Sequence, residues 1–247
     1  MKNVKLKLTS FDYQPGDTLL SKYRIVDKLG EGWEGEVYRI HEVNTDIERA
    51  AKMFFPHRNI NNRASRFYAR KLHKLRRCHI LIQYHNEETI YFDGVPVTVL
   101  ISEYVQGELL SEFIKKFPGK RLTPFQAIHL LYALTKGLEE IHLQNEYHGD
   151  LHLDNVIVNR YGLGFELKLL DMFHWGAPTA ANRNYDLCSL IRIIYDCLGG
   201  SKQYAKLPPE LKYICCGLKE SLIVKRFRKL SALRTHLEKF TWKERTV

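Results

Sequence analysis

Hydrophobic and polar residues alternate along much of the first hundred positions. This period of two predicts strands over residues 22–30, 35–43 and 48–55. Residues 88–105 read as a hairpin that turns at Asp93-Gly94, because this dipeptide favours the tight turn between two strands. The first part of the chain therefore predicts an antiparallel sheet.

Two further segments complete this strand-rich part. Residues 1–13 alternate lysine with aliphatic residues, which predicts a short strand and lacks the apolar core of a signal peptide. Residues 61–78 contain no glycine or proline and place Phe67, Leu72 and Leu75 at helical spacing. One helix is therefore expected beside the sheet.

After Gly107 the apolar residues recur at helical spacing. In the clearest helix Thr123 is an expected N-cap, Pro124 the first helical residue and Gln126 the partner in a capping box. The expected helices cover residues 108–117, 123–142, 185–198, 208–222 and 229–240. The helix over 185–198 is apolar nearly all round, which predicts that it is buried and that Gly199-Gly200 ends it.

These patterns predict an α+β, bilobal fold. Residues 1–104 would form an N-terminal lobe of antiparallel strands with one helix, and residues 105–247 a mostly helical C-terminal lobe. Hydrophobic residues make up 45% of the chain, enough for a core, and no apolar run reaches the length of a membrane span. The five cysteines contain no CxxC pair, which favours free thiols and a cytoplasmic protein.

Positive charge is concentrated in one segment. Residues 57–79 hold eight Lys or Arg residues and no Asp or Glu, within a chain of formal net charge +10. A second basic stretch covers residues 225–229. Such a field favours polyanionic partners, although a solvated helix face is the simpler alternative.

A glycine pattern and a lysine suggest a phosphate site. Gly30, Gly32 and Gly35 form G-x-G-x-x-G between two predicted strands, where backbone N–H groups can approach phosphate oxygens. Lys52 lies within the next predicted strand, and a lysine among apolar residues is costly to bury without an anion. A flexible hairpin and an edge lysine that points to solvent are the alternatives.

Three further residues suggest a metal and catalytic loop. Asp150 and Asn155 lie five positions apart, after a predicted helix and before the strand-like residues 156–158. Asp171 ends a second short strand over 167–173. If the two strands pair, Asn155 and Asp171 present oxygen ligands suited to Mg²⁺ with phosphate, and Asp150 can orient or deprotonate a hydroxyl.

In this order, the motifs resemble those of the protein-kinase-like superfamily, in particular bacterial Ser/Thr kinases of the Hanks type. "KLGEGWEGEV" is similar to the glycine-rich loop, "RAAKMF" to the strand-three lysine segment and "LISEYVQGELL" to the hinge. "YHGDLHLDNVIV" resembles the catalytic loop and "LLDMF" the metal-binding element. The resemblance covers most of the chain and implies an Mg-ATP-dependent phosphotransferase with a hydroxyl acceptor.

The resemblance also implies residue roles. Asp150 would be the catalytic base, His152 an assisting donor or a structural histidine, and Asn155 and Asp171 the Mg²⁺ ligands. Lys52 would bind the α- and β-phosphates of ATP in a cleft between the lobes. The implied nucleotide contacts are Gly30, Gly32 and Gly35 over the phosphates, Val37, Ala50 and Ile157 around the adenine, and Glu103 and Val105 at the hinge. Buried Asp186 and His148 would hold the catalytic loop.

Four departures from the family pattern affect the expected function. No acid lies between Glu48 and Glu87, so the usual helix glutamate that pairs with Lys52 is missing. Either Lys52 pairs with Asp171 or with the phosphates directly, or the chain does not transfer phosphate. Gly149 replaces the arginine that reads a phosphorylated loop, which predicts no such switch. His152 replaces a lysine, and "HGDLH" is similar to small-molecule kinases.

The fourth departure is the segment after Asp171. Fourteen residues separate Asp171 from Asp186, with residues 177–185 as the remnant of the peptide-docking platform. This predicts an open acceptor site for a small molecule, a folded partner or the protein's own tail.

Three interpretations stay open. The chain is an active kinase, a nucleotide-binding pseudokinase that acts as a scaffold, or a module that binds nucleic acid or another polyanion through helix 57–79. In a variant of the third interpretation, this helix docks an acidic protein partner. On that helix Arg66, Arg70, Lys74 and Arg77 would share one face.

Overall fold

The computed structural model describes residues 8–162, 164–174 and 176–242. The chain divides into two units, and each is described by itself. The first unit comprises residues 1–77 and 82–104, and the second comprises residues 78–81 and 105–247. The sequence places the boundary near residue 104, but residues 78–81 belong with the second unit.

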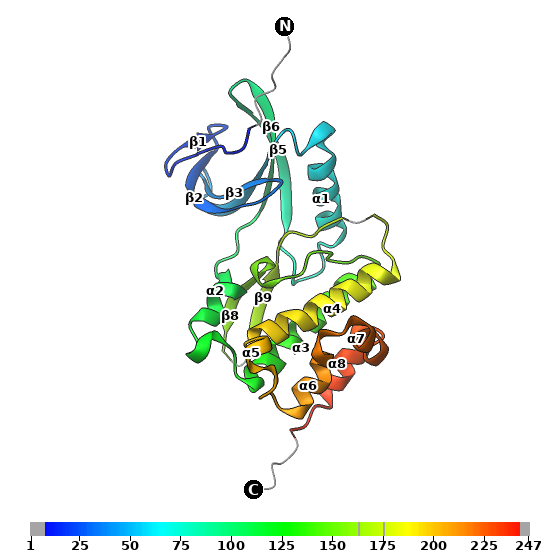
Figure 1. The fold of residues 1–247 in the computed structure, drawn as a ribbon. Coiled ribbons are helices and arrows are strands. Elements are labelled where there is room, and N and C mark those ends of the chain that lie inside the picture. The colour runs from blue at the N-terminus through cyan, green and yellow to red at the C-terminus, as the bar shows by residue number, and fades with distance from the viewer. Residues whose placement is uncertain (1–7, 163, 175, 243–247) are drawn as a thin grey trace. The chain divides into compact units, whose positions relative to one another are not determined.

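The first unit is built on a six-stranded antiparallel sheet of order β1-β2-β3-β4-β6-β5 (Figure 1). Its strands are β1 (Thr18–Leu19), β2 (Tyr23–Glu31), β3 (Gly35–Glu42), β4 (Ile47–Phe54), β5 (Tyr84–Phe92) and β6 (Val95–Glu103). The predicted hairpin is confirmed: β5 and β6 join at Asp93 and Gly94, whose φ angles of 49° and 77° are those of a tight turn with two left-handed residues. The antiparallel sheet expected from the alternation is therefore present.

One face of this sheet carries the core of the first unit. Tyr38, Ile40, Ala51 and Met53 are fully buried there, and Phe11 stacks on Phe55 with ring centroids 5.3 Å apart. The strand expected over 1–13 is not formed in its described part, because residues 8–13 instead cover the sheet face as an irregular segment. Residues 1–7 lie outside the described residues.

Helix α1 (Arg63–Lys74) is shorter than the predicted 61–78, because the backbone leaves the helical region at Leu75 (φ −92°, ψ 13°). Short 3-10 helix η1 (Ile60–Asn62) precedes α1, and Asn59 Oδ1 accepts a hydrogen bond from Ser65 N at 3.1 Å at its start. Arg77 therefore lies beyond the helix. The prediction that Arg77 shares a helix face with Arg66 and Arg70 was wrong.

The second unit is mostly helical, with a small antiparallel sheet of order β7-β8-β9. Its strands are β7 (Glu108–Leu109), β8 (Val156–Tyr161) and β9 (Phe165–Leu169). Its α-helices are α2 (Leu110–Lys115), α3 (Pro124–Leu143), α4 (Ala180–Cys197), α5 (Ser201–Tyr204), α6 (Pro209–Cys215), α7 (Glu220–Arg226) and α8 (Leu230–Glu238), with 3-10 turns η2 (Pro118–Lys120), η3 (Leu153–Asn155) and η4 (Cys216–Leu218). An α+β fold with a sheet-rich and a helical part is confirmed.

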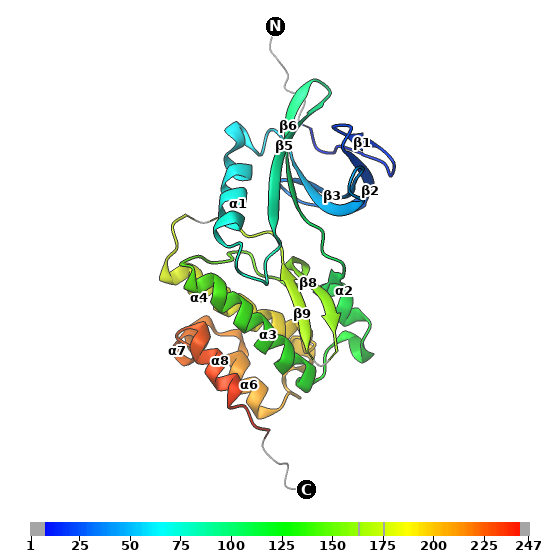
Figure 2. The ribbon, with the colours of Figure 1, turned by 180° about the vertical axis from the view of Figure 1, so that it is seen from behind.

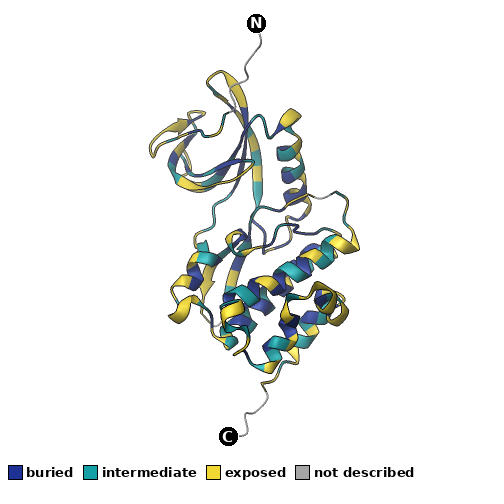
Figure 3. Ribbon diagram, in the orientation of Figure 1, coloured by how far each residue is buried: buried dark blue, intermediate teal, exposed yellow. Residues whose placement is uncertain are grey.

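Helices α3 and α4 form the centre of this unit, and α8 packs on α3 (Figure 2). The predicted capping box is present, since Thr123 Oγ1 accepts from Gln126 N at 3.2 Å. Buried residues recur along α4 (Figure 3), as its apolar sequence predicts. The α4 helix begins at Ala180, five residues earlier than expected, because Thr179 forms a second capping box with Asn182.

The helix predicted over 208–222 is two helices. Cys216, Gly217 and Leu218 have φ angles of 50°, 58° and 59°, a left-handed run that separates α6 from α7. Glycine is the residue that tolerates this conformation at least cost, which is how Gly217 permits the break.

Residues 78–81 join the second unit through backbone bonds and packing. Leu169 N donates to Ile80 O at 2.7 Å, and Lys168 Nζ donates to Leu81 O at 3.2 Å. Ile80 also occupies the space beside Gly137 of α3, where an added Cβ would lie 2.1 Å from Ile80 Cδ1.

All five cysteines are free, as predicted. Within the described ranges, the structure contains no helix whose length and apolarity would suit it to crossing a membrane.

Candidate functional site

The loop that follows α3 is fixed by one buried carboxylate. Asp186 of α4 is fully buried, and its two oxygens accept hydrogen bonds from His148 N at 2.7 Å and Gly149 N at 2.8 Å. His142 Nε2 lies 2.9 Å from the same carboxylate. The structural role expected for Asp186 is confirmed, because a buried carboxylate needs such donors.

Gly149 has a physical reason to be glycine. Its φ of 86° lies in the left-handed region, where a Cβ would strain the backbone. A side chain at this position, arginine included, is therefore disfavoured by the path of the loop.

Asp150 and Asn155 are in direct contact. Asn155 Nδ2 donates to the backbone oxygen of Asp150 at 2.7 Å and lies 3.3 Å from its carboxylate oxygen Oδ2. Asn155 is buried, whereas the side chain of Asp150 is 46% exposed. Because the amide nitrogen is used by Asp150, the amide oxygen of Asn155 is the atom suited to a cation, and the Asp150 carboxylate can still meet a substrate.

His152 lies beside the Asp150 carboxylate. Its Nδ1 accepts a hydrogen bond from Asp154 N at 3.2 Å, which places the proton of the neutral ring on Nε2. Nε2 is 3.7 Å from Asp150 Oδ2, and both side chains are about half exposed. The ring can therefore orient the carboxylate electrostatically.

The backbone next to Asp171 is hydrogen-bonded to two residues of the loop that follows α3. Leu170 N donates to Asn155 O at 2.9 Å, and His148 Nε2 donates to Leu170 O at 2.8 Å. Asp171 itself has a φ of 47°, a conformation uncommon for a residue with a side chain. The loop and the end of β9 thus place the residue before Asp171 in backbone contact with Asn155, whose side chain contacts Asp150.

The donor set fits magnesium better than a soft metal. The amide oxygen of Asn155 and the carboxylate of Asp171 are hard ligands, and Mg²⁺ typically uses one or two such groups with water and phosphate oxygens. In the described part of the chain, no three His, Cys, Asp or Glu side chains form a metal-binding group. A closed zinc-type site is therefore not present among those residues.

The glycine-rich loop of the first unit is the short connection between β2 and β3. Gly32 N donates to Gly35 O at 2.9 Å and closes the turn. A Cβ on Gly35 would lie 1.8 Å from Met53 O, so this position requires glycine. A Cβ added to Gly30 or to Gly32 would meet no other atom within 4 Å, so the backbones of both residues are accessible to a ligand.

Lys52 shares a sheet face with two residues expected around the adenine. Val37 is its direct partner in the β3–β4 register, and Ala50 lies two positions away on β4, so all three point to the face opposite the core. Glu103 ends β6, and its N–H donates to Gln83 O at 2.8 Å.

Of the other two expected nucleotide contacts, Ile157 is half-buried on β8 and Val105 lies in the irregular segment before β7.

A carboxylate that the sequence did not single out lies beside Lys52, while the expected pairing of Lys52 with Asp171 or with phosphate stays a prediction. Lys52 Nζ lies 3.3 Å from Glu34 Oε2, in the glycine-rich loop of the same unit. Because residues 49–86 contain no acid, the sequence suggested Asp171 or phosphate as the partner of Lys52. The loop before β3 also supplies a carboxylate, that of Glu34. The sequence feature that could have indicated this pair is Glu34, an acidic residue between Gly32 and Gly35 of the glycine motif.

The segment after Asp171 is shorter than expected. Because α4 begins at Ala180, residues 177–185 are not a free remnant, and only residues 170–179 connect β9 to α4. Tyr147 Oη donates to Gly176 O at 3.0 Å, and Arg183 Nη1 donates to Asn145 Oδ1 at 3.0 Å.

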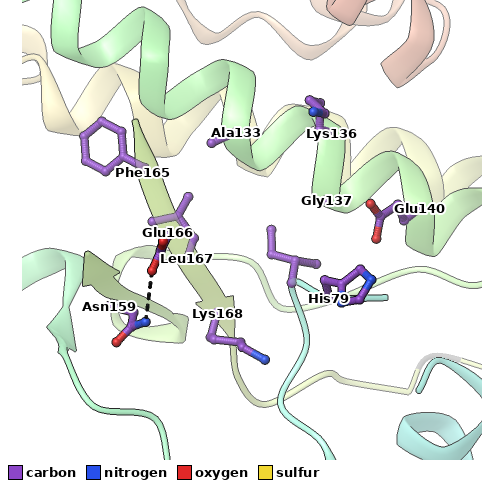
Figure 4. Close-up of a pocket in the computed structure, with 11 residues that line it drawn as sticks. His79, Ala133, Lys136, Gly137, Glu140, Asn159, Phe165, Glu166, Leu167 and Lys168 are labelled. Carbon is purple, nitrogen blue, oxygen red and sulfur yellow. Dashed lines mark hydrogen bonds between the residues drawn. The ribbon is translucent and has the colours of Figure 1, made fainter. Parts of the chain in front are cut away.

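A separate pocket of about 400 Å³ lies between α3, β9 and residues 79–80 (Figure 4). Lys136 and Glu140 come from α3, and Lys168 from β9. None of the predicted catalytic or nucleotide-binding residues lines it, so it is distinct from the Asp150 cluster.

Comparison with known proteins places this geometry in a family context. The family model described as "Protein kinase domain" matches residues 23–205. Aurora kinase B of Drosophila melanogaster is 27% identical over 219 residues, which are 85% of this chain and 59% of that protein. Serine/threonine-protein kinase pkn2 of Myxococcus xanthus is 27% identical over 152 residues, 61% of this chain and 18% of that protein.

A solved structure supports the fold. The chain matches a double mutant of the Mycobacterium tuberculosis PknI kinase domain with a TM-score of 0.66 and 16% identity, over 92% of this chain and 98% of that one. The chain thus spans at most about three fifths of the length of these two curated relatives, while it spans nearly all of this kinase domain.

Proposed function

The chain belongs to the protein kinase domain family, and on that premise we propose that it transfers a phosphoryl group from Mg-ATP to a hydroxyl acceptor. The observation that carries the proposal is the contact of Asn155 Nδ2 with the backbone and carboxylate oxygens of Asp150, in a loop that buried Asp186 fixes. This arrangement leaves a half-exposed carboxylate and an amide oxygen on one rigid loop.

In this proposal Asp150 orients the acceptor hydroxyl and accepts its proton, as a carboxylate within hydrogen-bond reach can do. His152 keeps the carboxylate in place through Nε2. Asn155 and Asp171 would hold magnesium, which would neutralise charge on the transferred phosphate. The hydrogen bond from Leu170 N to Asn155 O supports the joint use of these two ligands.

The first unit would bind the nucleotide itself. Lys52 would hold the α- and β-phosphates, with Gly30, Gly32 and Gly35 covering them through backbone N–H groups. Val37 and Ala50, on the same sheet face as Lys52, would contact the adenine together with Ile157, and the backbones of Glu103 and Val105 would bind its polar edge. The proposal requires Lys52 and Asp171 to act on one nucleotide.

The acceptor class follows from the short segment. Residues 170–179 are too few to form a platform on which an extended peptide could dock. Tyr147 is hydrogen-bonded to Gly176 within this segment, and Thr179 is already the N-cap of α4. We therefore expect the hydroxyl of a small molecule or a folded partner as the acceptor, and not an extended peptide.

Transfer from radiolabelled Mg-ATP, with autophosphorylation and ADP release as readouts, tests the proposal. Asp150→Asn should lower the rate by about a hundredfold or more, whereas Asp154→Asn, an exposed aspartate of the same loop, should change it little. A wild-type rate no greater than that of Asp150→Asn contradicts the proposal. A thermal shift with Mg-ATP but no turnover would identify a nucleotide-binding pseudokinase.

A second candidate function concerns the exposed basic face of α1. Arg63, Arg66 and Arg70 are exposed at spacings of three and four, and no carboxylate of the described residues lies within ion-pair distance of them. We propose that this face, with Lys74 at its end, binds a nucleic acid through its phosphates.

Salt dependence tests this second candidate. Binding of a single-stranded oligonucleotide should weaken steeply with salt, and Arg66→Glu with Arg70→Glu should reduce the slope of log affinity against log salt by about 1.4. Arg160→Glu, an exposed arginine on β8, is the control. Salt-independent binding contradicts the proposal, and binding of an acidic protein alone would assign the face to a protein partner.

A further inference from the structure

The glycine-rich loop, and not α1, brings a carboxylate of the first unit to Lys52. Glu34 Oε2 lies 3.3 Å from Lys52 Nζ, and the two side chains are 30% and 15% exposed. The sequence from Arg49 to Asn86 contains no Asp or Glu, so α1 has no carboxylate to offer. The first unit nevertheless forms an ion pair at this lysine.

What α1 offers instead is an aromatic ring. The Tyr68 ring centroid lies 4.6 Å from Lys52 Nζ, and Tyr68 is buried on the helix. An aromatic face attracts an ammonium group, but it supplies no oxygen that fixes the direction of an N–H bond. Glu34 supplies such an oxygen, and it can therefore orient the ammonium where the ring cannot.

The backbone of Glu34 is tied to the strand that carries Lys52. Phe55 N, one residue past β4, donates to Glu34 O at 2.9 Å. Gly35 permits contact with Met53 O, which a side chain would prevent. The loop tip is also held, because the Arg58 guanidinium stacks 3.9 Å from the Trp33 ring centroid. These contacts direct the Glu34 side chain toward Lys52.

We propose that Glu34 is the positioning residue for Lys52 and takes the role that a helix glutamate would have in phosphate binding. This inference rests on the proposed phosphotransferase function. Glu34 acts through Lys52, whose ammonium it holds for the phosphates. The glycine-rich loop would then both orient Lys52 and cover the phosphates, and α1 would not have to supply an acid.

A nucleotide-free experiment tests the ion pair. The amine of Lys52 is labelled with an acylating reagent, and the modified peptide is quantified by mass spectrometry. Glu34→Gln should raise the labelling rate severalfold, because the ion pair holds the amine away from the reagent. Glu31→Gln is the matched control, since Glu31 ends β2 beside the same loop, is 73% exposed and pairs with Lys28 at 2.7 Å. Equal rates for wild type and Glu34→Gln overturn the proposal.

Kinetics with Mg-ATP test the role. Glu34→Gln should lower kcat by about tenfold or more with a smaller change in KM for ATP, the pattern of a group whose effect is largest in the transition state. Adding Tyr68→Glu to Glu34→Gln should recover part of the loss, because the new carboxylate replaces the ring beside Lys52. Thermal melting verifies that each variant folds.

Two outcomes separate this inference from the proposed function. Tighter Mg-ATP binding and faster turnover in Glu34→Gln would overturn the inference, since Glu34 would then obstruct the phosphates. A wild-type protein that transfers no phosphate, but keeps the labelling difference, would refute the proposed function while the positioning of Lys52 by Glu34 stands.

Discussion

The catalytic loop of the second unit and the glycine-rich loop of the first are held by different kinds of interaction. Asp186 is fully buried and binds two backbone N–H groups of the catalytic loop. The glycine-rich loop is held at its base by the Phe55 N–Glu34 O bond and the part-buried Glu34–Lys52 pair, whereas Trp33 at its tip is 65% exposed. Buried charged hydrogen bonds are expensive to break, whereas exposed contacts exchange readily with water. We infer that Asp150 is presented rigidly and that the tip of the glycine-rich loop can adjust to a nucleotide.

Asp186→Ala should have the largest effect on this comparison. It leaves the N–H groups of His148 and Gly149 buried without their acceptor, which should lower the free energy of unfolding by about 3–5 kcal/mol. Phosphotransfer should fall by about a hundredfold, because the loop that carries Asp150 loses its support. Urea denaturation and the transfer assay measure both. Asp154→Ala removes an exposed carboxylate as a control, and similar small losses in the two variants would contradict rigid support by Asp186.

Glu36→Gln tests whether a buried carboxylate also stabilises the first unit, away from the tip of the glycine-rich loop. Glu36 is 1% exposed and accepts hydrogen bonds from Ser10 Oγ, Phe11 N, Lys28 Nζ and Tyr38 Oη on the core side of the sheet. The substitution should lower the free energy of unfolding, measured by urea denaturation, by about 1–3 kcal/mol at neutral pH. Glu31→Gln removes the exposed carboxylate opposite Glu36 in the β2–β3 register and should cost much less.

The pH dependence of this effect has a defined sign. Burial alone raises the pKa of Glu36, but hydrogen bonds from Tyr38, Lys28 and Ser10 outweigh it and hold the pKa below its usual value. The carboxylate therefore stabilises the fold above the unfolded pKa of about 4.3, and this contribution is lost as pH falls through the lower folded pKa. Wild type and Glu36→Gln should converge in acid. A stability difference that grows below about pH 4 would contradict this assignment.

Gly35→Ala should have an intermediate effect, because its Cβ would overlap Met53 O at 1.8 Å. We expect a loss of about 1–3 kcal/mol in the free energy of unfolding as β3 and β4 separate. Gly32→Ala is the matched control, since a Cβ added there would meet nothing within 4 Å. Equal melting temperatures for the two variants would show that the loop base is also adjustable.

His152→Ala should have the smallest effect. Nε2 is 3.7 Å from Asp150 Oδ2 and both groups are about half exposed, so solvent screens the interaction. We expect a loss of less than about tenfold in kcat, with unchanged folding. A loss as large as that of Asp150→Asn would mean that His152 acts on the reacting groups directly.

Features set by neighbouring residues were predictable from the sequence. The turn at Asp93-Gly94 and the capping box at Thr123 follow from short-range chemistry, and both are present. The left-handed residues 216–218 and the early end of α1 were missed, because the apolar pattern continues through both. Periodicity reports which face is buried, and it does not report where the backbone leaves the helix.

The candidate site shows the same limit. The role of Asp186 was expected from the family resemblance, and its bonds to His148 and Gly149 bear it out. The Glu34–Lys52 pair was not expected, because it depends on how the loop folds back along β4. An ion pair between a loop residue and a strand residue far along the chain leaves no periodic signal.

Single-turnover phosphate transfer from Mg-ATP by wild type, Lys52→Met and Asp171→Asn tests most directly whether these residues act on one nucleotide. We predict measurable transfer by wild type and a loss of about a hundredfold or more in each variant, because one would lack the proposed phosphate-binding ammonium and the other a proposed metal ligand. Transfer at the same rate in all three proteins would contradict the proposed function.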